Sequence, residues 1–181
     1  TGGKNAFFGN SAGQNNTTGE DNTALGSLAL KSNVSGSNNT AIGREALENN
    51  TASNNTAVGY NSLLTNTSGT SNTALGFRAL KDNTTANSNT AIGNDALQDN
   101  TTGTQNTAVG VVSLDANTTG SSNVAVGYGS LNKNTTASFN TALGYQSLYS
   151  NVTGTRNVAV GYNTLSLSTA NDNTAIGHDA L

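Results

Sequence analysis

Residues 55–71 read NTAVGYNSLLTNTSGTS, and residues 72–88 repeat the pattern as NTALGFRALKDNTTANS. Outward from this pair, a block of Asn, Thr or Val, Ala, an aliphatic residue and Gly recurs along the chain at steps of 16 or 17 residues, with a variant near the N-terminus. Such self-similarity is the signature of a repeat architecture. We therefore treat residues 1–181 as one array of about 10.5 coils, excerpted from a longer array, and call equivalent positions columns.

A period of 17 residues is too short for two helices per repeat and suits one coil of a solenoid. The expected fold is all-β, a parallel β-solenoid (β-roll) of 17-residue coils, in which strands of successive coils lie about 4.8 Å apart. The array would then form a rod about 50 Å long. In the strand block Thr56 and Val58 should face one side and Ala57 the other. The later Ala-Leu pair, as at Ala46-Leu47, fits either a second strand or a helical turn.

Charge separates the columns cleanly. The seven basic and ten acidic residues all lie outside the Asn, Thr/Val, Ala, aliphatic, Gly and Leu columns. Because an unpaired charge is costly in a thin core, we expect these columns to be buried or interfacial. We expect the Leu and aliphatic columns to fill each coil. The Ala column would leave a flat outer surface for lateral association, most simply as a homotrimer, with filament growth as the alternative.

Asparagine recurs at two positions in nearly every coil. Its side chains can form hydrogen-bonded amide ladders between coils, or they can act as turn residues that satisfy backbone groups. The recurring Asn-x-Ser/Thr pattern follows from this turn and is not taken as a set of glycosylation sites. The residues we expect to form structural ladders are Asn22, Asn39, Asn55, Asn72, Asn89, Asn106, Asn123, Asn140, Asn157, Leu47, Leu63, Leu80, Leu97 and Leu114.

Composition argues against several classes of function. The chain is 33% hydrophobic and 9% charged, with a net charge of −3 and no Cys. Disulfides and thiolate chemistry are therefore excluded, and nucleic-acid binding and membrane insertion are not expected. His178 is the only histidine, so we interpret it as a surface residue. We expect no catalytic, metal-binding or cofactor-binding residues, and we do not expect an enzyme.

Aromatic residues often follow the block's Gly. Tyr128, Tyr145 and Tyr162 occupy this column in successive coils, so their rings should stack at about the coil spacing. One hypothesis is a tyrosine ladder that binds a glycan or cell-surface receptor. The other is packing between coils or chains at a corner.

Threonine suggests a further alternative. Regular Thr arrays on a flat β-solenoid face resemble those by which several antifreeze proteins order ice-like water. Thr73, Thr90 and Thr107 would carry such an activity here.

The repeat NTAIGxxALxxNTTGxxN also resembles arrays in bacterial and phage proteins described as tail-fibre-domain-containing. Its NTAVG block is similar to the NSVAIG block in the head repeats of trimeric autotransporter adhesins. That resemblance implies a left-handed β-roll assembled as a trimer, although the adhesin repeats are shorter. We expect a structural, extracellular role at a cell surface or on a virion, as a shaft or head segment of a tail fibre, surface adhesin or filament.

Overall fold

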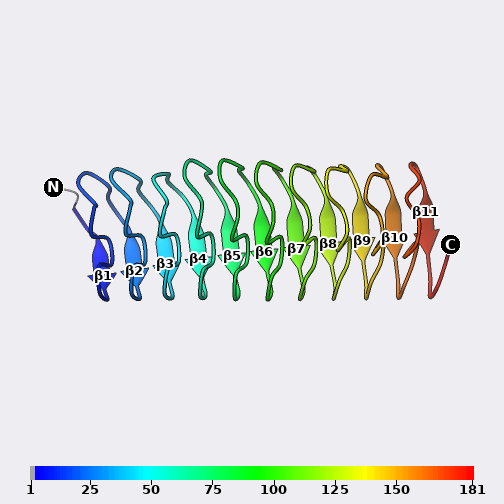
Figure 1. The fold of residues 1–181 in the computed structure, drawn as a ribbon, viewed down its shortest axis with the longest axis horizontal. Helices are drawn as coiled ribbons and strands as arrows, with labels where there is room; N and C mark the ends of the chain where they lie inside the picture. The colour runs from blue at the N-terminus through cyan, green and yellow to red at the C-terminus, as the bar shows by residue number, and fades with distance from the viewer. Residues whose placement is uncertain (1–2) are drawn as a thin grey trace.

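The computed structural model describes residues 3–181. The chain forms a straight rod with its two termini at opposite ends (Figure 1). One parallel sheet runs along the rod, its strands follow chain order, and no helix occurs among the described residues. The strands are β1 (Ala6–Phe8), β2 (Thr23–Leu25), β3 (Thr40–Ile42), β4 (Thr56–Val58), β5 (Thr73–Leu75), β6 (Thr90–Ile92), β7 (Thr107–Val109), β8 (Val124–Val126), β9 (Thr141–Leu143), β10 (Val158–Val160) and β11 (Thr174–Ile176). The predicted parallel β-solenoid is confirmed.

Equivalent residues lie beside one another in neighbouring coils. The β5–β6 pair aligns Thr73 with Thr90 and Ala74 with Ala91. The same register holds between β3 and β4, although the repeat between them is one residue short. The missing residue is therefore absorbed in the turn. A shift by one residue in the strand would turn every side chain to the opposite face, so the register is strongly specified.

The interior differs from the sequence prediction in one respect. The Ala column points into the coil and is buried throughout β2 to β10, as at Ala57 and Ala91, and does not form the outer surface we expected. The aliphatic column, expected inside, lies on the outer face, where Leu75 is 46% exposed. The Leu column does fill the coil. Inward-facing Leu leaves room for only a methyl group on the strand opposite, because interiors are close-packed.

The Ala-Leu segment is neither a strand nor a helical turn. It consists of successive turns, and each regular coil places non-glycine residues in the left-handed region at fixed positions, as at Asn61, Leu63 and Ser71 with φ of 56°, 50° and 60°. The strand's closing glycine also has positive φ, 136° at Gly59. A Cβ there would lie 2.2 Å from the carbonyl oxygen of Gly76, so only Gly fits between coils.

The first coil is modified, as the sequence suggested. Phe7 stands in the Ala column and Gly13 in the Leu column. A Cβ on Gly13 would lie 2.4 Å from the Phe7 ring. The ring therefore takes the space that leucine fills in other coils, and the two exceptions compensate each other.

Candidate functional site

The first Asn column begins each strand block, from Asn5 to Asn173. Asn89 shows its bonding. Its Nδ2 donates to the carbonyl oxygen of Gly103 at 2.9 Å, and its Oδ1 accepts the backbone N–H of Asn106 in the next coil at 2.9 Å. The interior of the rod thus satisfies backbone groups with a buried amide. The same pair of bonds recurs from Asn5 to Asn157 without interruption.

The second Asn column lies in the turn and runs from Asn16 to Asn151. Here amide bonds to amide: Asn100 donates to Oδ1 of Asn83 at 3.1 Å, and Asn117 donates to Oδ1 of Asn100 at 2.8 Å. Each Nδ2 also reaches a carbonyl oxygen further along its own turn, as Asn100 does at Gly103. Both interpretations of asparagine therefore hold. These side chains, which carry the glycosylation-like pattern, are buried from Asn33 to Asn151.

The second Asn column is interrupted twice. The Oδ1 of Asn33 is buried without a hydrogen-bond partner, because the next coil is one residue short and Asn50 does not donate to it. The Oδ1 of Asn151 is likewise unpartnered, because Ser168 takes the place of asparagine in the coil that follows. The breaks in this ladder coincide with the two 16-residue repeats.

The structure places the predicted ladder residues in the interior. The nine asparagines are at most 1% exposed, and the leucines of the set are fully buried. The leucines are Leu47, Leu63, Leu80, Leu97 and Leu114. Neutral amides and leucines therefore share the interior of the rod.

The predicted aromatic stack is present. The rings of Tyr128 and Tyr145 have centroids 5.3 Å apart at 11°, and those of Tyr145 and Tyr162 are 5.1 Å apart at 8°. All three rings are half-exposed. The stack continues onto His178, 4.9 Å from Tyr162, so this histidine is a surface residue but also a member of the aromatic column. The sequence could have indicated this membership, because His178 directly follows Gly177.

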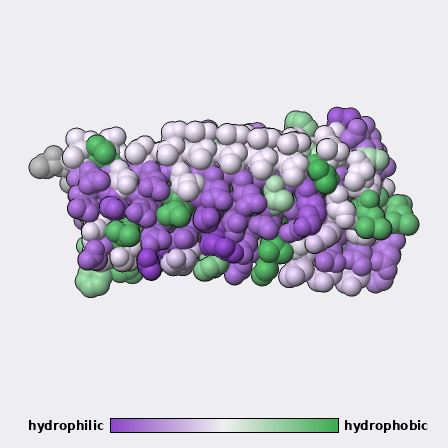
Figure 2. Space-filling view, in the orientation of Figure 1, coloured by the Kyte–Doolittle hydropathy of each residue, from purple (hydrophilic) through white to green (hydrophobic). Residues whose placement is uncertain are grey.

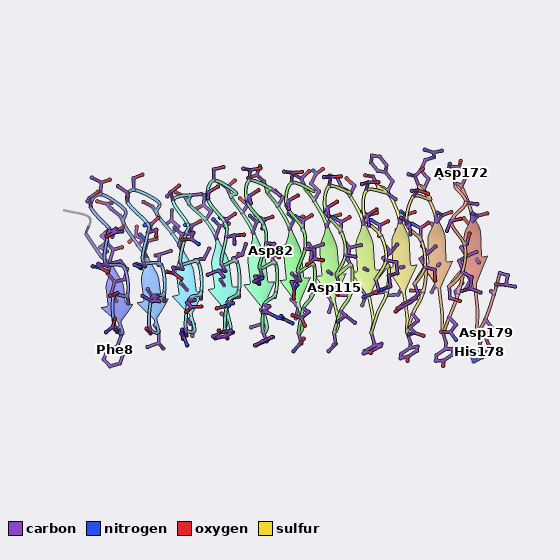
Figure 3. All side chains as sticks on the ribbon, in the orientation of Figure 1. Phe8, Asp82, Asp115, Asp172, His178 and Asp179 are labelled. Carbon is purple, nitrogen blue, oxygen red and sulfur yellow. The ribbon has the colours of Figure 1, made fainter. Side chains whose placement is uncertain are left out.

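His178 marks the edge of the rod at which the strands end (Figure 3). Its Nδ1 lies 2.9 Å from Oδ2 of Asp179, and both side chains are exposed. The aromatic column therefore runs along a solvent-facing corner at the carboxyl ends of the strands. We refer to Tyr128, Tyr145, Tyr162 and His178 as the aromatic stack.

A shorter pair lies in the same column. Tyr60 and Phe77 stack with centroids 5.5 Å apart at 14°. The Arg78 guanidinium lies 4.8 Å from the Phe77 ring and makes a two-pronged ion pair with Asp95 at 2.7 and 2.8 Å. Arg44 lies 5.8 Å from Tyr60. Apart from the contact between the adjacent residues Arg78 and Phe77, these contacts join successive coils.

One carboxyl group lies at the boundary of the interior. Asp115 is half-buried, and its Oδ1 has no hydrogen-bond partner. Burial raises the pKa of Asp115 to about 6, and the nearby carboxylates of Asp99 and Asp95 add to the rise. Asp115 and Asp82 mark the middle of the rod in Figure 3.

The outward face of the sheet carries the Thr/Val and aliphatic columns and no charge. Thr56 and Thr73 are exposed, while Thr90 and Thr107 are partly exposed. Elsewhere, the face drawn in Figure 2 is mostly hydrophilic, with hydrophobic residues in separate spots. We call the strand surface formed by the Thr/Val and aliphatic columns the outer sheet face.

Among residues 3–181, no group of three or more His, Cys, Asp or Glu is arranged to hold a metal ion. Over the same residues no helix could span a membrane. No protein-family model matches the chain, and neither a curated protein nor a solved structure is significantly similar to it.

Proposed function

We propose that this chain is a structural rod, a shaft or head segment of an extracellular tail fibre, adhesin or surface filament. The observation that carries the proposal is the unbroken first Asn column, in which a buried side chain ties each coil to the next from one end of the rod to the other. Such a ladder resists bending and local opening along the axis. The resemblance to tail-fibre arrays supports the same role.

The outer sheet face is the surface we propose for self-association, as a homotrimer or a filament. Its aliphatic residues are half-exposed, as at Leu75 and Leu143. It carries no charged residue, so identical copies can approach without like-charge repulsion. The Ala column is buried and therefore cannot form this interface. Because the aliphatic column lies outside, we place the interface on the opposite side of the strand from the one expected from the sequence.

Light scattering on a sizing column tests this proposal. A stable species near three times 18.2 kDa is expected for the trimer, and mass that grows with concentration is expected for a filament. The Leu75→Lys variant should shift the chain toward monomer. The Val34→Lys variant is the matched control, because Val34 has the same 46% exposure but lies in the turn. A monomer at all concentrations would contradict self-association.

Ice binding is a second candidate, favoured by one observation. The Thr column lies outward on the sheet in register between coils, so it forms a regular exposed array. Thermal hysteresis should then appear and fall when Thr73, Thr90 and Thr107 are each changed to Tyr. Thr102→Tyr, at an exposed turn position, is the control. A flat hysteresis trace removes this candidate.

The glycan-binding alternative has weaker support. A sugar ring binds an aromatic side chain through the flat face of the ring. The Tyr145 ring has a neighbour on each face, at 5.3 and 5.1 Å. Loss of binding to a cell-surface glycan array in the Tyr128→Ala, Tyr145→Ala and Tyr162→Ala variant remains the test of this alternative.

A further inference from the structure

We propose that the tyrosines of the aromatic stack are a site of oxidative cross-linking. A one-electron oxidant of the peroxidase class, with hydrogen peroxide, would join Tyr128 to Tyr145 or Tyr145 to Tyr162 through a dityrosine bond. The inference concerns a covalent modification and is independent of which fibre the rod serves.

The geometry brings the reacting groups together before any oxidation. Both ring pairs are nearly parallel with centroids little more than 5 Å apart. Two tyrosyl radicals must meet within their short lifetimes, and neighbours held in a stack do not need to diffuse. The rings are between 42% and 49% exposed, so an oxidant can reach them and the rings can tilt toward one another.

Coupling of two tyrosines is a two-electron oxidation. Each phenol gives one electron to the oxidant and its hydroxyl proton to water, leaving a phenoxyl radical with spin at the carbon ortho to oxygen. The two ortho carbons form one C–C bond. Each then loses its hydrogen as a proton while the phenol O–H is restored. Two electrons and two protons leave in total, and hydrogen peroxide accepts them to give two water molecules.

The remaining aromatic residues define where the reaction should not occur. Tyr60 is stacked in nearly the same geometry, but its partner Phe77 has no hydroxyl group and cannot form a phenoxyl radical. Tyr149 lies outside the aromatic column, near Lys133 at 5.9 Å. The His178 end of the stack also lacks a second phenol. Cross-linking should therefore be confined to the run from Tyr128 to Tyr162.

The bond would run parallel to the rod axis. Tyr128 and Tyr145 belong to neighbouring coils, so one bond closes a loop of a single repeat. A cross-link of this kind restricts the unfolded chain. The oxidised rod should show a higher thermal midpoint than the untreated rod, measured by circular dichroism.

The positions of the tryptic cleavage sites allow the cross-linked tyrosines to be identified directly. Cleavage after Lys133 and Arg156 places Tyr128, Tyr145 and Tyr162 in three different tryptic peptides. The 181-residue chain is treated at low concentration with a peroxidase and limiting hydrogen peroxide, then denatured and digested. We expect the blue fluorescence of dityrosine and linked peptide pairs that lack two hydrogen atoms.

Matched variants decide the proposal. Tyr145→Phe keeps the ring stack but should abolish both links, whereas Tyr149→Phe should leave the yield unchanged. Adding Phe77→Tyr to the Tyr145→Phe chain should restore fluorescence through a new link between positions 60 and 77. Retention of fluorescence in Tyr145→Phe would overturn the proposal. So would links found only between separate molecules, seen as higher bands on a denaturing gel.

Discussion

Asn89 and Asn100 belong to the same coil, are fully buried and donate to the same carbonyl oxygen, that of Gly103. Their other bonds differ. Asn89 accepts a backbone N–H from the next coil, whereas Asn100 accepts a side-chain amide. The first Asn column stays continuous through both short repeats, and the second does not. A ladder whose bonds between coils reach the backbone is therefore kept, and one whose bonds between coils join only side chains can be broken.

The largest expected effect breaks the first column. Asn89→Ala leaves the buried N–H of Asn106 without a partner and opens a small cavity, and should destabilise the rod by about 3 kcal/mol. Chemical denaturation followed by circular dichroism measures the loss. Asn94→Ala is the control, because Asn94 is exposed in the same coil, and should change stability by less than about 0.5 kcal/mol.

The second column should tolerate the same truncation better. Asn100→Ala leaves Oδ1 of Asn83 unpartnered, a state that Asn33 and Asn151 already show. We expect a loss of about 1.5 kcal/mol, half of that at Asn89. The same denaturation experiment compares the two. Equal losses would mean that the cavity, and not the orphaned backbone group, sets the effect of both substitutions.

Asp115 tests how a charge at the edge of the interior affects the stability of the rod, in contrast to the neutral amides inside it. Its pKa is about 6 in the folded rod against 3.8 for the ordinary group. The folded state therefore holds the proton more tightly, and stability should fall as the pH rises from about 4 to 6. After allowance for partial exposure the loss is about 1 kcal/mol. Asp115→Asn should remove this contribution, and denaturation midpoints at a series of pH values measure it.

We expect the smallest effect from a substitution that restores the second Asn column. Ser168→Asn places an amide where Asn151 lacks a donor, and should stabilise the C-terminal end by about 0.5 kcal/mol. Amide hydrogen exchange around Asn151 is the sensitive readout. Unchanged exchange would show that the short repeat, and not the serine, keeps the ladder open.

Much of the fold could be predicted from the repeat. The period specified one coil per repeat, and alternation in Thr56-Ala57-Val58 specified two faces. Alternation does not say which face is inner, and hydrophobicity alone favoured Val58 over Ala57. Leu63 fills the opposite side of the coil and leaves space for Ala57 but not for the larger Val58, so Ala57 faces inward. This space exists only in the closed coil, and the alternating pattern does not reveal it.

Only part of the candidate site could be predicted from the sequence. The stacking of Tyr128, Tyr145 and Tyr162 followed directly from column and period. His178 was predicted as a surface residue but not as a stack member, although it follows Gly177 directly, as Tyr162 follows Gly161. The left-handed backbone conformation of leucines such as Leu63 could not be predicted from the sequence, because leucine has no preference for that conformation.

The termini at opposite ends give the rod a defined response to tension (Figure 1). Force applied at the two ends acts along the hydrogen bonds between coils, which are loaded in series. All coils then carry the same force, and an end coil, which has a neighbour on one side only, should separate first. Each coil released should lengthen the chain by roughly 55 Å. Stretched in this way, the molecule would yield in equal steps at nearly constant force, and so limit the load passed to whatever it holds.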